Sequence, residues 1–416
     1  MTLPPALSSR GCPVLHGADF AARPEAVYDQ LRAQGPVGWA EIAPAVNALV
    51  VTSHRAAVTL LNDTNGYSKD ARRWKDLNNG YVPADSPVLA MMAWRPSVLY
   101  TDGQEHARLR WAMDDCLSRI DLHELREITE RSARTLIAGV TEQGHADLMA
   151  DFADTLPMLV FAELLGCPEE MSRRMVHACQ ALIGAGPEAA QGGADFAAIL
   201  QELIHLRRRQ PGQDLTSWMI SHPARLSNDE CLNQLFCAVG AGIVPVAAWM
   251  AWSLWLLLRD DAYAGNLSAG TVTIRKALEK ALWEYSPMAN FSAHYATKES
   301  WLQGAVIPAG VPVLISHAAA NTDPALPPGL GYGNRSHLAW STGPHRCPAV
   351  SPATTMVQAG TETILNLLWD IELADPAADV PLRHGPFHQC PQAMPVRFRP
   401  KPAERIIRTT NAGGTA

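Results

Sequence analysis

The stretch Trp340-Ser-Thr-Gly-Pro-His-Arg-Cys-Pro-Ala349 decides the fold that this sequence predicts. Gly343 and Pro344 favour a tight turn, in which backbone N–H groups point toward whatever the turn encloses. The two basic residues before Cys347 can bring positive charge beside its sulfur. Both effects favour a thiolate over a thiol, so we expect Cys347 to be more than a small buried apolar residue.

A helix is expected directly after this loop. Ser351 can serve as its N-cap, and Pro352 suits the first helical position. Small and apolar residues then recur at helical spacing at Met356, Val357, Gly360, Ile364 and Leu367. The positive end of the helix dipole would lie near the cysteine and further favour an anionic sulfur.

Composition argues against several classes of protein. The net charge is -7 without a basic block, which does not suit binding to nucleic acid or to an anionic membrane surface. The eight cysteines lie scattered without CxxC pairs, so neither a zinc site nor a disulfide framework is indicated. The first residues lack a basic region followed by an apolar core, so we expect no signal peptide and a cytoplasmic protein.

One uncharged stretch, 235–258, is long enough to cross a bilayer. Gly240, Gly242 and Pro245 interrupt it, and no Lys/Arg cluster flanks it. A helix that is apolar all round can equally be the central helix of a large soluble protein. We therefore expect a buried helix and no membrane partner.

The cysteine loop resembles the haem-binding loop of the cytochrome P450 (haem-thiolate) superfamily, Phe-Gly-x-Gly-x-His-x-Cys-x-Gly, at Gly343, His345 and Cys347. Three further positions of the cofactor loop depart from the pattern: Trp340 replaces Phe, and Ser341 and Ala349 replace Gly. The resemblance implies that Cys347 ligates the iron of haem b (iron protoporphyrin IX) as a thiolate.

Supporting motifs extend the resemblance over nearly the whole chain. It implies a mainly α, single-domain cytochrome P450 fold with small peripheral β-sheets, in which haem lies between the long apolar helix and the cysteine loop. We expect an N-terminal arm at 1–23, the haem-thiolate domain at 24–400 and a C-terminal tail at 401–416. Local patterns predict helices at 24–34 and 54–61, a strand at 48–52 and a hairpin at 306–316.

Basic residues at helical spacing suggest a carboxylate site. His106 and Arg110 lie four apart, on one face of a helix, where two donors can hold carboxylates; a solvated charged face is the alternative. They resemble the family's His-x-x-x-Arg helix, and His294-Tyr-Ala-Thr297 stands where the family has Arg-x-Ala-Thr. The resemblance implies that His106, Arg110, His294 and His345 surround the haem propionates.

The long helix departs from the family at positions that carry chemistry. The pattern Ala-Gly-x-(Asp/Glu)-Thr falls on Ala241, Gly242, Ile243, Val244 and Pro245. The small residues let a helix pass close to a porphyrin, whereas the acid and alcohol, which relay protons to dioxygen in the family, are lost. Val244 and Pro245 cannot carry a proton, and Pro245 is expected to kink the helix.

Another departure concerns the family's Glu-x-x-Arg helix. It aligns with Lys280-Ala-Leu-Trp283, so neither charged partner is present, and joint loss avoids leaving one buried charge alone. We expect Trp283 to fill the space by packing. Glu279-Lys-Ala-Leu-Trp283 resembles the Glu-x-x-Leu-Trp helix of an actinobacterial subfamily.

Several apolar residues are predicted to line a substrate pocket. The segment 67–101 reads as a long irregular loop, which is uncommon unless functional, and in the family it covers the pocket. The turn 385–389 resembles one that reaches back into the pocket. The predicted pocket residues are Met92, Trp94, Val239, Ala241, Asn290, Phe291 and Phe387. Ordinary packing is the alternative for each of them.

Three functions remain open from the sequence. The favoured one is oxidative coupling of aromatic side chains in a small ribosomal peptide, in bacterial secondary metabolism. A conventional monooxygenase that hydroxylates a small organic substrate is the second, and a non-catalytic haem sensor or partner protein is the third. Both enzymatic functions would need a separate ferredoxin and ferredoxin reductase, because no reductase domain is attached.

Overall fold

A computed structural model describes residues 12–183, 188–259, 271–328, 333–368 and 370–408. The chain forms two compact units. Unit 1 comprises Met1–Arg108, Leu282–Cys347 and Pro381–Gln389, and unit 2 comprises Leu109–Ala281, Pro348–Val380 and Cys390–Ala416. Because each unit combines distant stretches of chain, no single linker divides the sequence into two domains.

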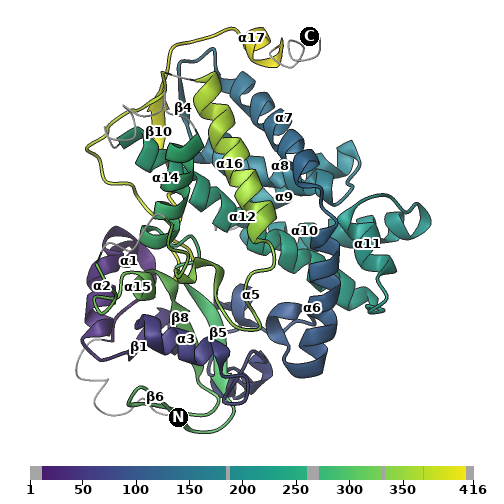
Figure 1. The fold of residues 1–416 in the computed structure, drawn as a ribbon. Helices are drawn as coiled ribbons and strands as arrows, with labels where there is room; N and C mark the ends of the chain where they lie inside the picture. The colour runs from purple at the N-terminus through teal and green to yellow at the C-terminus, as the bar shows by residue number, and fades with distance from the viewer. Residues whose placement is uncertain (1–11, 184–187, 260–270, 329–332, 369, 409–416) are drawn as a thin grey trace. The chain divides into compact units, whose positions relative to one another are not determined.

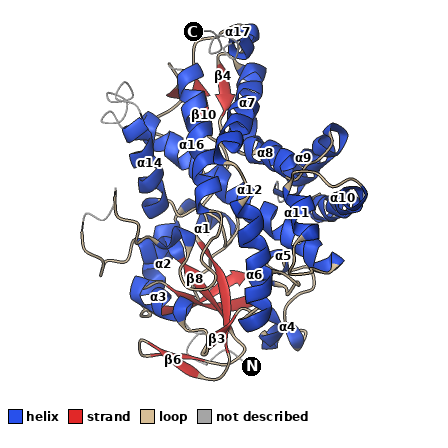
Figure 2. Cartoon of the chain, turned by 45° about the vertical axis from the view of Figure 1, so that its right-hand side comes forward, coloured by secondary structure: helices blue, strands red, loops and turns tan. Residues whose placement is uncertain are grey.

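Unit 1 is built on a five-stranded sheet with the strand order β1-β2-β8-β5-β3. The strands are β1 (Val37–Ala43), β2 (Val46–Val51), β8 (Pro312–Ser316), β5 (Asn290–Ala296) and β3 (Tyr67–Ser68). The pair β2 and β8 is parallel, and the other neighbours are antiparallel. Every residue of β5 and β8 is buried, as is usual for strands covered on both faces. Strands of this sheet are drawn red in Figure 2.

Short helices and one small hairpin complete unit 1. The hairpin joins β6 (Ser300–Leu302) to β7 (Ala305–Ile307). The helices are α1 (Gly17–Ala22), α2 (Pro24–Arg32), α3 (His54–Asn62), η1 (Ala71–Arg73), α4 (Lys75–Asn78), α5 (Leu89–Met92), η2 (Val98–Tyr100), α15 (His317–Asn321) and η5 (Leu338–Trp340). Serine side chains cap two of them: Ser53 accepts the amide of Ala56 in α3, and Ser316 accepts that of Ala319 in α15.

Unit 2 is mainly helical. Its helices are α7 (Leu122–Val140), η3 (Met149–Ala153), α8 (Thr155–Leu164), α9 (Glu169–Ile183), α10 (Ala189–Arg209), α11 (Leu215–Ser221), α12 (Asn228–Arg259), α16 (Val350–Leu367) and α17 (Ala403–Arg408). A small sheet has the order β4 (His145–Asp147), β10 (Pro395–Arg397), β9 (Glu372–Leu373). Figure 1 shows α16 beside α7, with which it packs. Two further helices, α6 (Gly103–Ser118) and α14 (Thr271–Glu284), contribute residues to both units.

The long apolar stretch forms α12, one continuous helix that includes Pro245. By length and composition α12 could cross a membrane. Within unit 2 it packs against α8, α10 and α16, and every residue from Val246 to Leu257 is buried. This arrangement matches the core helix that the sequence predicts.

Several local predictions need correction. From residue 12 onward, the predicted N-terminal arm packs against the rest of unit 1, because Leu15 is fully buried and Val14 forms a β-bridge with Glu41. The segment 306–316 supplies two strands, but they do not pair with each other: β7 joins β6, whereas β8 joins β2 and β5. The segment 67–101 contains one short strand and four short helices.

Gly192 lies within α10, where a Cβ would lie 2.7 Å from the amide nitrogen of Leu182, so this glycine permits close packing against α9. One helix start differs from the prediction. The α16 helix begins at Val350 with Ala349 as its N-cap, so Ser351 lies inside the first turn.

Trp283 packs as the sequence predicts. It is 4% exposed, its Nε1 donates to the carbonyl of Asn334 at 3.0 Å, and its ring meets that of His337 edge to face with 5.6 Å between centroids. The indole therefore fills a buried site and satisfies its polar atom.

We expect Trp283→Arg to lower the free energy of unfolding by about 3 to 5 kcal/mol, because it would bury a charge without a matched partner. Urea unfolding followed by tryptophan fluorescence measures the loss. Trp301→Arg is the matched control, since Trp301 is 70% exposed in the same unit, and it should change stability by less than about 0.5 kcal/mol. Equal effects of the two variants would contradict the assigned packing.

Candidate functional site

The cysteine loop in unit 1 is closed by backbone hydrogen bonds. The amide of Cys347 donates to the carbonyl of Trp340 at 2.9 Å, and the amide of Arg346 donates to that of Gly343 at 3.1 Å. Gly343 has φ +73°, and a Cβ there would lie 2.2 Å from the carbonyl oxygen of Leu61, so only glycine fits this turn. Ser341, which replaces a glycine of the family pattern, also has a positive φ of 57°.

Two histidines of unit 1 meet beside this loop. The ring centroids of His106 and His345 are 4.0 Å apart, and His106 is 7% exposed. Nε2 of His345 lies 3.8 Å from Oδ1 of Asp102. The structure thus brings together two of the residues predicted to bind carboxylates, one from α6 and one from the cysteine loop.

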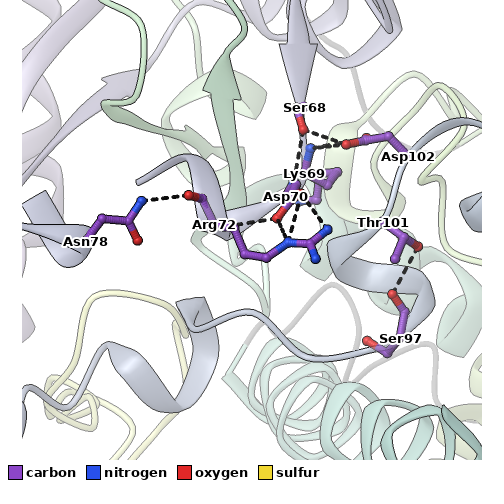
Figure 3. A network of polar contacts seen from close by, with 8 residues as sticks. All are labelled: Ser68, Lys69, Asp70, Arg72, Asn78, Ser97, Thr101 and Asp102. Carbon is purple, nitrogen blue, oxygen red and sulfur yellow. Dashed lines mark hydrogen bonds and ion pairs between the residues drawn. The ribbon is translucent and has the colours of Figure 1, made fainter. Parts of the chain in front are cut away.

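Asp102 also binds the end of β3, through the contacts with Ser68 and Lys69 that Figure 3 shows. Its Oδ2 accepts the hydroxyl of Ser68 at 2.6 Å and the amide of Lys69 at 2.9 Å. Burial alone would raise the pKa of Asp102, but hydrogen bonds from His345, Ser68 and the Lys69 amide outweigh burial and lower the pKa to about 2. The carboxylate is therefore ionised at neutral pH and orients the groups around it.

His294 lies on β5 at a bulge in its pairing with β8. Ser292 has a positive φ of 59°, and its carbonyl accepts a hydrogen bond from Nδ1 of His294. Burial, then the positive charge of Lys69, lower the pKa of His294 well below its usual value. Neutral His294 therefore carries its single ring proton on Nδ1, which leaves Nε2 as a hydrogen-bond acceptor. This protonation state suits a donor partner better than the propionate predicted from the sequence.

Arg110, the fourth predicted propionate residue, belongs to unit 2. Its Nε lies 2.6 Å from Oδ1 of Asp114, one turn further along α6. An ion pair with a partly exposed carboxylate contributes little stability and can exchange for another anion.

The predicted helix residues of α12 lie in unit 2. Val239 is buried, Gly242, Val244 and Pro245 are half-buried, and Ala241 is exposed on an otherwise largely buried helix. A Cβ on Gly242 would lie 2.3 Å from the ring of Phe161, so this glycine lets α8 approach α12. Val244 and Pro245 bring no titratable group to this part of the helix.

The predicted pocket residues of unit 1 share one hydrophobic cluster. Met92, Phe291 and Phe387 are buried in it, and Trp94 packs against it. The rings of Phe291 and Phe387 meet edge to face with 5.7 Å between centroids. Asn290 is fully buried and donates from Nδ2 to the hydroxyl of Tyr28 at 3.1 Å and the carbonyl of Pro386 at 2.8 Å, while its Oδ1 accepts no hydrogen bond within the described chain.

Sequence reasoning missed Asp102, Ser68 and Lys69. One signal was available, because Asp102 stands one helical turn before His106 and an acid in that position can orient a neighbouring imidazole. Ser68 and Lys69 carried no recognisable spacing. Their role follows from the pairing of β3 with β5, which is distant in sequence.

The described residues contain no group of three or more His, Cys, Asp or Glu side chains that could hold a metal ion, and none of the eight cysteines is in a disulfide.

Several known proteins resemble this chain in sequence and in fold. No protein-family profile matches the chain. It is 26% identical over 361 residues to 2-hydroxy-5-methyl-1-naphthoate 7-hydroxylase of Streptomyces carzinostaticus, covering 83% of this chain and 88% of the relative. It is 27% identical over 398 residues to cytochrome P450 monooxygenase PikC of Streptomyces venezuelae, covering 92% and 93%. The solved structure of myxobacterial cytochrome P450 CYP267B1 with myristic acid has a TM-score of 0.80 at 28% identity, over 92% of this chain and 98% of that structure.

The similarity in sequence and in the mainly helical fold with small sheets places the chain among haem-dependent oxidoreductases. The curated relatives and structural neighbours consistently identify the chain as a bacterial cytochrome P450, an enzyme whose cofactor is haem b. The donors of unit 1 fit such a cofactor, because buried His106 and Lys69 and half-buried His345 are basic groups of the kind that binds carboxylates.

Asp102→Asn tests the electrostatics of this cluster. Because the folded pKa of about 2 lies below the ordinary value, the ionised carboxylate stabilises the protein above about pH 4, and this stabilisation is lost as the pH falls toward 2. The side chain is 36% exposed, so we expect a loss of only about 1 kcal/mol at pH 7.

Urea unfolding at pH 7 and at pH 3 measures this difference, which should shrink at the lower pH. The exposed Asp85 of the same unit provides the control variant Asp85→Asn. A loss from Asp102→Asn that is the same at both pH values would show that the carboxylate is not stabilised as described.

Proposed function

We propose that Cys347 ligates the haem iron through its thiolate, and that His106 and His345 bind a haem propionate. The observation that carries this proposal is the contact between the two imidazoles beside a turn that only glycine permits at position 343. Contacts from Trp340, Ala349 and Arg110 rest on the motif resemblance. When bound, the haem supplies the one-electron and dioxygen chemistry, with electron donation from the thiolate.

We infer that the chain's own contribution to the reaction is orientation, with little proton transfer from the long helix. Val244 and Pro245 replace the acid and alcohol of the family pattern. Protons must then come from ordered water or from the substrate itself. Such a site favours a substrate that places its own O–H or N–H group beside the reacting oxygen.

The reaction that we favour is oxidative coupling of two aromatic groups in a small peptide. In this reaction two X–H or C–H bonds of the substrate break, one bond forms between the two groups, and two hydrogen atoms leave. Dioxygen takes these hydrogen atoms together with two external electrons and two protons, and both oxygen atoms leave as water. The substrate gains no oxygen.

The cluster of Met92, Phe291 and Phe387 supports an aromatic substrate, because such side chains pack against aromatic rings. Oδ1 of Asn290 is a buried acceptor that a substrate N–H could satisfy. An indole, imidazole or peptide amide offers that donor, so an aromatic peptide fits these groups better than a hydrocarbon does.

Oxygen insertion into a small organic substrate is the second proposed function. The activities named for similar proteins favour it, because these relatives include a naphthoate hydroxylase, a nocardicin C N-oxygenase and a mycinamicin IV hydroxylase/epoxidase. All of these relatives are enzymes, which argues against the haem sensor considered from sequence. For either reaction we infer electron supply from a separate ferredoxin and ferredoxin reductase, in the bacterial cytoplasm.

Cys347→Ser should abolish the carbon monoxide difference band from which the family takes its name, because an alcohol is a poor substitute for the thiolate. Reduced protein is compared with and without carbon monoxide. Cys12→Ser in the same unit is the control and should keep the band. A Cys347→Ser protein with an unchanged band would refute the ligand assignment.

Mass spectrometry under ¹⁸O₂ separates the two reactions. We expect short peptides that contain Trp and Tyr to yield a product lighter by two hydrogen atoms and free of label. A product that carries one labelled oxygen atom would refute coupling and establish oxygen insertion. Restoring both family residues, as Val244→Glu with Pro245→Thr, should lower hydrogen peroxide release per electron consumed.

A further inference from the structure

Three sulfur-bearing side chains of unit 2 lie close together where the chain turns from α8 into α9. Cys167 is in the turn, and its Sγ–H donates to Sδ of Met175 at 4.0 Å. Cys179 follows Met175 by four residues on α9, so both lie on the same face of that helix, one turn apart. Met175 is 1% and Cys179 is 2% exposed, and Cys167 is half-buried. Two thiols and one thioether are thus gathered in one part of the core.

The two thiols also influence each other electrostatically. Burial raises the pKa of Cys167 and that of Cys179 to about 12 each. At Cys167 the positive charge of Arg207 opposes this shift, whereas the charges of Asp214 and of a Cys179 thiolate add to it. Such an effect of one thiolate on the pKa of another requires that the two sulfur atoms be close in space.

The turn that carries Cys167 is held in place by its surroundings. Gly166 has φ +76°, and a Cβ there would lie 2.5 Å from Oδ2 of Asp214, so the turn needs glycine. Arg207, on α10, donates to the carbonyl of Gly166, and its Nε lies 3.0 Å from the same Asp214 oxygen. The amide of Cys167 donates to the carbonyl of Ala162 at 2.9 Å. These contacts fix the sulfur of the turn relative to α9, which packs against both α8 and α10 (Figure 2).

The separation of the sulfur atoms matches that of two ligands on one metal ion. Two metal–sulfur bonds of about 2.3 Å that meet at about 120° hold their sulfur atoms about 4.0 Å apart. The distance between Sγ of Cys167 and Sδ of Met175 has this value. The angle is that of three ligands arranged in one plane around a metal, and Cys179 is the side chain placed to supply the third ligand.

The chemistry of this donor set favours monovalent copper. Thiolate and thioether sulfur are soft ligands that select Cu(I) over harder cations. Zinc instead takes four ligands from cysteine, histidine and carboxylate side chains, and a thioether is not among them. Because Cys167 is half-buried, the ion can reach the site from the surface. The guanidinium of Arg207 opposes the negative charge that two thiolates bring.

We propose that Cys167, Met175 and Cys179 bind one monovalent copper ion in unit 2. On binding, both thiols release their protons to solvent, and three metal–sulfur bonds form without any transfer of electrons. Two thiolates around one monovalent ion leave a net charge of minus one. The site shares no residue with the loop of Cys347, so it does not rest on the proposed haem ligation.

The test is the retention of copper by purified haem-loaded protein, dialysed without oxygen and with a reductant against the Cu(I) chelator bathocuproine disulfonate. Elemental mass spectrometry then counts copper atoms per chain. We expect the wild type to retain one copper ion that Cys179→Ala lacks. Met175→Leu should bind copper at least about a hundredfold more weakly, because even groups that only support a metal ligand contribute 10- to 100-fold to affinity.

Two buried sulfur residues elsewhere in unit 2 provide matched controls. Cys231 is 1% exposed on α12, and Met250 is fully buried on the same helix. Cys231→Ala and Met250→Leu should therefore retain copper as the wild type does. Retention by Cys179→Ala and Met175→Leu equal to that of these two controls would overturn the proposal.

X-ray absorption at the copper edge tests the ligand set directly. The wild type should show three sulfur neighbours at about 2.3 Å, and Met175→Leu should show two. A first shell of nitrogen or oxygen, or an unchanged number of sulfur neighbours in the variant, would overturn the proposal. Leucine has nearly the volume of methionine, so Met175→Leu carries both measurements if Cys179→Ala does not fold.

Discussion

The register between β3 and β5 determines which polar groups of unit 1 meet. Through the hydroxyl of Ser68 and the amide of Lys69, at the end of β3, it fixes the carboxylate of Asp102. A slip of one residue would turn Lys69 to the other face of the sheet and remove two of the donors to Asp102. The arrangement of the imidazoles at the cysteine loop thus depends on a backbone pairing only two residues long in β3.

The buried titratable side chains of unit 1 lower the stability of the folded protein. Lys69, His106, His294 and His317 are all buried, and burial of titratable groups opposes folding unless each finds a partner. The presence of these four side chains in one unit accords with the proposed binding of haem propionates.

The sequence predicted those features of the structure that depend on residues near one another in the chain. The turn at Gly343 and the long helix α12 each follow from residues close together in the chain. The burial of Trp283 was predicted from the missing charges of its own helix, whereas its partners Asn334 and His337 are distant in sequence. The pairing of β8 with β2 could not be predicted, because β2 is distant in sequence and the residues of a strand do not specify which strand it pairs with. The proton on Nδ1 of His294 was equally hidden, since it depends on the positive φ of Ser292.

The interleaving of the two units constrains how the chain folds as it is synthesised. The β1–β2 hairpin emerges early, yet β2 lacks its parallel neighbour until the ribosome has passed Ser316, and unit 1 is complete only after Gln389. Until then the edge of β2 is open to pairing with other chains. Late long-range pairing of this kind slows folding and exposes strand edges to aggregation. Heterologous expression should accordingly benefit from slow translation and from chaperones that hold the nascent N-terminal strands apart.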